Sequence, residues 1–262
     1  MHLSVRQSEI LRQVRQRGSC TIGDLASHLK VSDETIRRHV KPLVTEGLVR
    51  RVHGGIVLPD PYNEPPIQRR LLEQPEAKER IAAVVAASIK DGDSLVIDTG
   101  STTTYVARAL LEHSNLVVVT NSAQIAGLLA CRNGNRVFMA GGELRPHDAA
   151  AFGPDTTDFV RRFEVQHAIL SMGAIHADKG FMVYHLCEAE FSQAAIGQAE
   201  RVIVAADSTK FDRSSLVRVC APEAIDLLVT ERRPAADLAR RLAEAEVEVR
   251  VAFEADDRNA AA

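Results

Sequence analysis

The stretch from residue 21 to residue 40 constrains the fold more than any other part of this sequence, because it carries two short amphipathic helices in succession. Thr21 can cap the first helix, whose apolar residues follow the i, i+3, i+4, i+7 spacing of one buried face. Ser32 can cap the second helix after a short break. Two short helices joined by a tight turn form the helix-turn-helix arrangement, which places its second helix in the major groove of DNA. We therefore predict a helix-turn-helix over residues 20–39.

The exposed face of the second helix carries hydroxyl, guanidinium and imidazole groups that can bind DNA. Arginine can make a bidentate contact with guanine or hold a phosphate, whereas a pair of surface arginines taken alone is more simply a solvated helix face. Residues 46–58 favour the DNA-binding interpretation, because they read as two short strands around a His-Gly-Gly turn, a basic wing. The predicted DNA-contacting residues are Ser32, Thr35, Arg37, Arg38, His39, Arg50, Arg51, His53 and Gly54.

A further helix precedes this pair. Ser4 can cap it and Gly18 can end it. Pro42 lacks a backbone amide hydrogen, so we expect a kink or an early end in the second helix of the pair. The residues predicted on the inner face of the first helix are Val5, Ile10, Leu11 and Val14.

Charge is unevenly divided along the chain. The net charge of the 262 residues is −3, but residues 1–58 hold 10 Lys+Arg against 5 Asp+Glu, which leaves 22 against 30 in the remainder. The N-terminal part therefore carries +5 and the rest −8. This asymmetry is typical of a protein in which only one domain contacts phosphate.

Composition excludes several classes of protein. With 45% hydrophobic residues the chain can bury a large core, and no apolar run approaches the roughly 20 residues of a membrane span. We expect a soluble cytoplasmic protein. The four cysteines and the histidines show no metal-ligand spacing, so we predict reduced thiols, no disulfide, no metal and no cofactor.

Prolines mark the domain boundary. Residues 59–75 contain Pro59, Pro61, Pro65, Pro66 and Pro75, which cannot sustain a helix or a strand ladder. We predict a DNA-binding domain over residues 3–58, a linker over 59–75, a second domain over 76–253, and a frayed tail over 254–262.

The second domain alternates helices with continuous apolar strands. Strands rich in Val, Ile and Leu that alternate with helices indicate a mainly parallel sheet covered on both faces, an α/β fold. A hairpin is expected around residues 179–180. The predicted strands are 94–98, 116–120, 136–140, 167–172, 202–206, 225–229 and 247–251, and the predicted helices are 77–90, 102–111, 123–130, 156–163, 188–199 and 235–245.

Polar residues follow several of these strands. The first strand leads into Asp98-Thr99-Gly100-Ser101-Thr102-Thr103, a turn whose amides and hydroxyls can bind an anion such as phosphate. Thr120 and Asn121 follow the second strand, and Gly141 and Gly142 the third. Lys210, after a later strand, can add a positive charge. Ligands bind at the carboxyl ends of parallel strands, so we predict an anion site there.

Both halves of the chain resemble the DeoR family of bacterial transcription regulators. The resemblance rests on S-x-x-T-I-R-R from Ser32 to Arg38, on Val52-His53-Gly54-Gly55, and on D-x-G-S-T-T from Asp98 to Thr103. It continues through T-N-S at 120–122, G-G-E-L-R at 141–145, E-A-E at 188–190 and D-S-x-K-F at 207–211.

This resemblance implies a fold and a ligand for the second domain. In the DeoR family that domain is similar to ribose-5-phosphate isomerase and glucosamine-6-phosphate deaminase, and it senses phosphorylated sugars or polyols. Segments 111–116 and 141–145 are most similar to the glycerol-3-phosphate repressor branch. The implied effector-binding residues are Asp98, Gly100, Ser101, Thr102, Thr103, Thr120, Asn121, Gly141, Gly142, Glu188 and Lys210.

The sequence departs from the family pattern at two places. His39 stands where relatives usually carry an aspartate, and a neutral imidazole cannot hold an arginine fork as a carboxylate does. Ser192 and Gln193 stand where relatives commonly have a basic pair.

The favoured interpretation is a repressor that binds a double-stranded DNA operator and is released by the phosphorylated effector. Because one small domain reaches few base edges, we expect a homo-oligomer, a dimer or tetramer, on paired half-sites. The alternative is a sugar-phosphate isomerase or deaminase with an appended DNA-binding arm, in which Asp98 or Glu188 is the general base.

Overall fold

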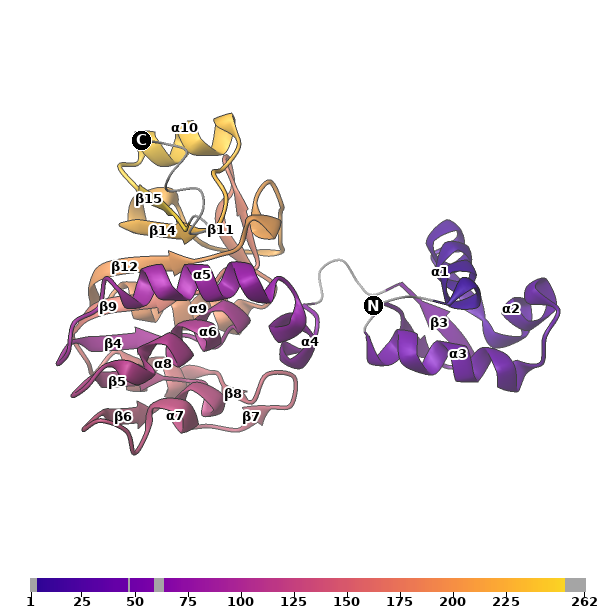
Figure 1. The fold of residues 1–262 in the computed structure, drawn as a ribbon, viewed down its shortest axis with the longest axis horizontal. Coiled ribbons are helices and arrows are strands. Elements are labelled where there is room, and N and C mark those ends of the chain that lie inside the picture. Colours follow the sequence, from indigo (N-terminus) through magenta and orange to yellow (C-terminus); the bar gives the residue numbers. More distant parts are fainter. Residues whose placement is uncertain (1–3, 47, 59–63, 253–262) are drawn as a thin grey trace. The chain divides into compact units, whose positions relative to one another are not determined.

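The computed structural model describes residues 4–46, 48–58 and 64–252 of the chain. It divides into two compact units, Met1–Arg69 and Arg70–Ala262 (Figure 1). Gly47 of the predicted wing, the linker prolines Pro59 and Pro61, and the tail 254–262 lie outside the described residues.

The first helix of the N-terminal unit is α1, Val5–Arg17. Ser4 caps it through a reciprocal capping box, and Gly18 ends it with a φ of 75°, as predicted. The prediction that Val5 is buried is wrong, since Val5 is 87% exposed. Val5 is the first helical residue, and the buried positions Ile10, Leu11 and Val14 begin more than one turn later.

The predicted helix-turn-helix consists of α2, Ile22–Leu29, and α3, Asp33–Thr45. The Oγ1 atom of Thr21 accepts a hydrogen bond from the Asp24 amide at 3.0 Å, and the Oγ atom of Ser32 accepts one from the Thr35 amide at 3.3 Å. Both predicted caps are therefore confirmed.

Pro42 does not end α3 early, contrary to one of the two expectations, because the helix continues to Thr45. Proline removes only its own amide hydrogen bond, and its carbonyl still accepts one from the Glu46 amide at 2.8 Å.

The wing is confirmed as a hairpin of β2, Arg50–Val52, and β3, Gly55–Val57. A third strand, β1 at Ser19–Thr21, pairs antiparallel with β3 and gives the order β1-β3-β2. We did not predict β1, because three residues of alternating exposure are too short to show a period. Gly55 lies against β1 so closely that a Cβ atom would be 2.4 Å from the Cys20 carbonyl oxygen.

The C-terminal unit is built on a seven-stranded sheet in which every pairing is parallel. This confirms the predicted α/β fold. The order is β15-β14-β12-β9-β4-β5-β6. The strands are β4 Ser94–Ile97, β5 Val117–Thr120, β6 Arg136–Met139, β9 Val165–Leu170, β12 Ala199–Ala205, β14 Leu227–Thr230 and β15 Glu248–Val251.

Helices cover this sheet. The strand order grows outward in opposite directions from the β4–β9 pair, so right-handed crossovers place α6 and α7 on one face and α9 and α10 on the other. Figure 1 shows α5 beside α6. The helices are α4 Ile67–Leu72, α5 Pro75–Ala86, α6 Ser101–Ala109, α7 Ala123–Leu129, α8 Pro154–Val160, α9 Leu186–Ile196 and α10 Ala236–Glu244, with 3-10 turns η1 Leu110–Glu112, η2 Ser208–Lys210 and η3 Pro222–Ala224.

Two small antiparallel sheets complete the unit. The predicted hairpin is formed by β10, Ala174–His176, and β11, Gly180–Val183, and β13, Val217–Cys220, joins it as an unpredicted third strand. The hairpin of β7, Leu144–Arg145, and β8, Ala150–Ala151, was also unpredicted.

All four cysteines are free thiols. Within the described ranges, no group of three or more His, Cys, Asp or Glu residues is placed to hold a metal ion. No helix of the described chain has the length and apolar character to cross a membrane.

Candidate functional sites

The exposed face of α3 presents two arginines side by side. Arg37 and Arg38 are exposed, while Thr35 and His39 are half-buried. Neither arginine forms an ion pair with a residue that the structure describes. Ser32 is exposed, but its hydroxyl accepts the capping hydrogen bond from the Thr35 amide and lies 2.9 Å from the Thr35 hydroxyl. Any contact of Ser32 with DNA would therefore be made while the hydroxyl also caps α3.

The wing presents Arg50, Arg51, His53 and Gly54, all of which are exposed. Arg50 and Arg51 are successive residues of β2, so their side chains point to opposite faces of the hairpin and only one can face a given surface. Gly54 has a φ of 76°, and its carbonyl accepts a hydrogen bond from the Ile22 amide at 3.0 Å. This bond fixes the tip of the wing to the start of α2.

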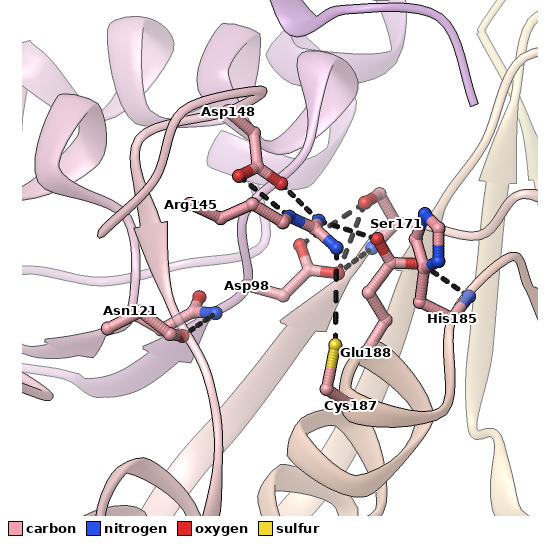
Figure 2. A network of polar contacts seen from close by, with 9 residues as sticks. Asp98, Asn121, Arg145, Asp148, Ser171, His185, Cys187 and Glu188 are labelled. Carbon is pink, nitrogen blue, oxygen red and sulfur yellow. Dashed lines mark hydrogen bonds and ion pairs between the residues drawn. The ribbon is translucent and has the colours of Figure 1, made fainter. Parts of the chain in front are cut away.

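In the second unit, the neighbouring strands β4 and β9 end in a buried carboxyl and a serine. One Asp98 oxygen accepts hydrogen bonds from the Ser171 amide at 2.8 Å and from the Ser171 hydroxyl at 3.1 Å (Figure 2). Burial raises the pKa of Asp98 to about 8, which the Ser171 bonds oppose and the charge of Glu188 reinforces. Asp98 is therefore largely uncharged at neutral pH.

The turn after Asp98 leads into α6. The Thr103 hydroxyl donates to the Asp98 carbonyl at 3.0 Å, and Ser101, Thr102 and Thr103 are all buried. Gly100 accommodates the close approach of β9, because a Cβ atom there would lie 2.1 Å from the Ser171 Oγ atom. No side chain of the described residues caps α6, so the amides of its first turn can bind an anion.

The next strand, β5, ends in two fully buried polar residues. The Thr120 Oγ1 atom accepts a hydrogen bond from the Ser122 amide at 3.1 Å, and the Asn121 Nδ2 group donates to the Ala151 carbonyl at 3.0 Å. The latter bond fixes the orientation of the amide. The Asn121 Oδ1 atom is then a buried acceptor with no hydrogen-bond partner among the described residues.

Two glycines follow β6, the strand next to β5 at the edge of the sheet. The Gly141 carbonyl accepts a hydrogen bond from the Thr156 hydroxyl at 3.0 Å. Gly142 has a φ of 141°, a conformation that disfavours any side chain.

Arg145 occupies the centre of Figure 2, between two carboxylates. Its guanidinium donates to Asp148 through Nε, at 3.1 Å, and Nη2, and to the Glu188 Oε1 atom at 2.6 Å. It also lies over the Phe152 ring, 4.3 Å from the centroid. Burial opposes the charge of Arg145, but the bonds to Asp148 and Glu188 outweigh it and raise its pKa. Glu188 also accepts a hydrogen bond from the His185 amide at 3.2 Å, a capping bond at the start of α9. The Arg145–Glu188 bond thus joins the β7–β8 hairpin to the start of α9.

Lys210 lies at the end of η2 and is half-buried. No hydrogen bond of the described chain joins it to the network around Asp98 and Arg145. Its charge instead acts on Lys78 of α5, a lysine that is only 2% exposed. The structure thus brings the predicted residues of β4, β5 and α9 to one edge and places Lys210 near enough to Lys78 for its charge to lower the pKa of that lysine.

Sequence reasoning missed several residues of this edge. Arg145 and Ser171 were recognised only as parts of a motif and of a strand. Asp148 was not singled out, although its partner Arg145 lies only three residues away. Lys78 carried no signal, because its partners are backbone carbonyls. The Ser192 and Gln193 departures have structural explanations. Ser192 is 2% exposed, and the Gln193 side chain donates to the Val219 carbonyl at 2.9 Å.

Comparisons with known proteins agree with these two units. A family model described as the DeoR-like helix-turn-helix domain matches residues 6–62, and one described as the DeoR C terminal sensor domain matches residues 73–232.

Three curated relatives align over most of the chain. The Glycerol-3-phosphate regulon repressor of Escherichia coli (strain K12) is 36% identical over 89% of this chain and 93% of its own length. The HTH-type transcriptional repressor CsqR of the same organism is 33% identical over 93% and 94%. The Transcriptional repressor AccR of Agrobacterium fabrum is 33% identical over 86% and 88%.

Solved structures give a more distant likeness, of fold alone. Ribose 5-phosphate isomerase A from Methanocaldococcus jannaschii aligns with a TM-score of 0.39 at 16% identity, over 53% of this chain and 55% of that chain. The tetrameric eIF2B-beta2-delta2 complex from C. thermophilum aligns with a TM-score of 0.45 at 16% identity, over 92% and 71%.

Proposed function

The chain belongs to the DeoR family of transcription regulators, and on that premise we propose that it is a repressor released from its operator by a phosphorylated sugar or polyol. The predicted regulator, rather than an enzyme, is confirmed by relatives that are named transcriptional repressors. The isomerase or deaminase alternative is therefore not favoured.

One observation carries this proposal, namely that the chain combines an unpaired arginine face with a buried polar edge that can take an anion. Arg37 and Arg38 point away from the core of their unit and find no carboxylate among the described residues. The first turn of α6 offers amides that no described side chain caps. The two features suit a polyanion that binds outside and a small anion that binds within.

We assign the DNA contacts to the exposed face of α3 and to the wing. Arg37 and Arg38 would reach base edges, and the wing arginine that faces the duplex, Arg50 or Arg51, would contact a phosphate. The proposed set is Ser32, Thr35, Arg37, Arg38, His39, Arg50, Arg51, His53 and Gly54.

We assign the effector contacts to the carboxyl edge of the sheet. The phosphate would bind the amides and hydroxyls that begin α6, and a hydroxyl of the ligand would donate to the open Oδ1 atom of Asn121. Neutral Asp98 tolerates an anion nearby, which a carboxylate would repel. The proposed set is Asp98, Gly100, Ser101, Thr102, Thr103, Thr120, Asn121, Gly141, Gly142, Glu188 and Lys210.

We further propose that the repressor acts as a homo-oligomer, at least a dimer. The base edges that one α3 helix can reach are few, and paired half-sites about 10 bp apart, or a multiple of that, would double them. Operator fragments selected by the protein should therefore contain two copies of one short sequence.

The test uses duplexes that the full chain selects from a random library, and a panel of phosphorylated sugars and polyols that starts with glycerol 3-phosphate. One compound should lower the fraction of bound DNA, and at 100 times its dissociation constant it should stabilise the protein by about 2.7 kcal/mol in a thermal unfolding assay. The same compound without its phosphate is the control. Turnover of any panel member at enzymic rates, or DNA binding that no member affects, contradicts the proposal.

A further inference from the structure

We propose that Lys78 and Tyr105 are positioning residues that hold residues 70–74, here called the connector. They attach the connector to the carboxyl edge of the sheet to which we assign the effector contacts, here called the effector edge, and they transmit effector binding to the connector. The proposal rests on the function proposed above and adds its route of regulation. The connector is the first part of the second unit, so the chain that enters from the DNA-binding unit reaches the sensor domain through it.

Three backbone carbonyls of the connector are held by these two side chains. The Lys78 ammonium donates to the Arg70 and Glu73 carbonyls, each at 2.5 Å, and the Tyr105 hydroxyl donates to the Leu71 carbonyl at 3.0 Å. Carbonyls at the end of a helix lack partners within the helix, and a positive charge there is favourable. Lys78 and Tyr105 thus complete the C-terminal end of α4.

Both side chains are buried, so these bonds are protected from water. Lys78 is 2% exposed and Tyr105 is 8% exposed. The helix that they complete has only six residues, too few to be stable alone. Leu71 is buried but Leu72 is 80% exposed, so apolar packing holds only one side of this turn. The Arg70 carbonyl also accepts a hydrogen bond from the Glu73 amide at 3.2 Å, and Arg70 is 7% exposed. The hydrogen bonds from Lys78 and Tyr105 add to these contacts and fix the connector to α5 and α6.

Each of these residues also belongs to, or faces, an element of the effector edge. Tyr105 lies on α6, one turn after Ser101 and two residues after Thr103, the first and last of the α6 residues that would bind the phosphate. Lys78 lies close enough to Lys210 and Asp207, at the end of β12, for their charges to act on it. A ligand that shifts the start of α6, or neutralises Lys210, therefore changes the bonds that hold the connector.

The direction of the electrostatic effect follows from the charges. Burial lowers the pKa of Lys78 to about 8, with Asp207 opposing this shift and Lys210 adding to it. An anion bound near Lys210 would offset that repulsion and favour the ammonium form of Lys78. Hydrogen bonds from a charged donor are stronger than those from a neutral amine, so effector binding should tighten the connector.

The test compares Lys78→Met and Tyr105→Phe with the wild-type full chain, and uses Lys90→Met, an exposed lysine just after the same helix, as the matched control. Tyr105→Phe removes one hydroxyl and keeps the ring beneath Arg108. Amide hydrogen exchange of residues 70–78 reports on the connector, glycerol 3-phosphate is the probe, and its affinity is measured by calorimetry.

In the wild type and in Lys90→Met, saturating glycerol 3-phosphate should slow exchange in residues 70–78 at least tenfold. In Lys78→Met and Tyr105→Phe this slowing should be lost, while probe affinity changes less than threefold. Equal slowing in all four proteins overturns the proposal, and so does loss of probe affinity in Lys78→Met, which would make Lys78 a direct ligand.

A second readout needs no small molecule and separates the two proposals. Both variants should change affinity for the selected operator at least threefold, whereas Lys90→Met should not. If the wild type does not bind glycerol 3-phosphate, that compound is not the effector, but the operator measurement still tests whether Lys78 and Tyr105 act through the connector. Unchanged operator affinity in both variants then overturns it.

Discussion

The arginines of α3 and the arginine of the β7–β8 hairpin are chemically identical and have opposite surroundings. Arg37 and Arg38 are exposed and form no ion pair with described residues, whereas the Arg145 side chain is 25% exposed and sits between Asp148 and Glu188. The first pair offers all its donors to an external partner. Arg145 instead donates its hydrogen bonds to Asp148 and Glu188 within the fold.

This difference separates two ways in which an arginine can serve a regulator. A cation without internal partners contributes little to folding, and its removal should cost mainly DNA affinity. A cation that neutralises two nearly buried carboxylates holds loops together, and its removal leaves those charges uncompensated. The predictions below test this separation, in order of expected effect.

The largest effect is expected from Arg145→Met. This change leaves the Asp148 and Glu188 side chains, 2% and 12% exposed, without their common partner. We expect a loss of about 3 kcal/mol in the free energy of unfolding, near the lower end for a broken buried pair because Arg145 is itself partly exposed. Urea denaturation of the full chain, followed by circular dichroism, measures it.

Arg161→Met is the matched control, because Arg161 pairs with Asp158 on the surface with side chains 57% and 63% exposed. That variant should remain within about 0.5 kcal/mol of the wild type. A loss of similar size in the two variants would show that the Arg145 network is no more structural than a surface pair.

A smaller effect, and on a different quantity, is expected from Arg37→Ala and Arg38→Ala. If either arginine makes a bidentate base contact, its loss should weaken operator binding by about 1–3 kcal/mol, roughly fivefold to 160-fold. Unfolding midpoint and effector affinity should not change, since neither side chain has a described ion-pair partner. Fluorescence anisotropy with the selected duplex measures the first, and wild-type affinity in both variants would refute the role assigned to α3.

The same contrast explains which features could be read from the sequence. Helix caps such as Thr21 and Ser32 act on amides three residues away, and the wing is a local hairpin, so short patterns predicted both. The parallel strands were also predicted, because each is a continuous apolar run that must be covered on both faces. The prediction that Val5 is buried failed, because its position in the helical repeat does not show whether another element packs against it.

The effector edge was predictable only in part. Strand ends identify Asp98, Thr120 and Asn121, since parallel topology brings them to one edge. The bonds that define the network span long sequence separations, 73 residues from Ser171 to Asp98 and 43 from Arg145 to Glu188. No local pattern encodes such pairs. The role of Lys78 is still harder to predict from the sequence, because its partners are backbone carbonyls and not side chains.

The smallest expected effect concerns the pH dependence of stability and depends on Asp98. Burial raises the pKa of this carboxyl from 3.8 to about 8 in the folded chain. Between these values the folded state holds a proton that the unfolded state has released. Stability from this group is therefore fully present below about pH 4 and is lost as pH rises through 8.

Asp98→Asn places a neutral isostere where the folded chain already prefers a neutral group, so it should remove this part of the pH dependence. From pH 7 to pH 9 the wild type should lose about 1.4 kcal/mol in total more than the variant, because the limit set by one proton, about 1.4 kcal/mol per pH unit, falls off as the pH passes 8. Asp158→Asn, a change at an exposed carboxylate, should leave the wild-type slope intact. Urea midpoints across this range measure all three proteins. Parallel curves for wild type and Asp98→Asn would mean that Asp98 is charged in the folded state, and a carboxylate at this edge would then repel the small anion that we propose binds there.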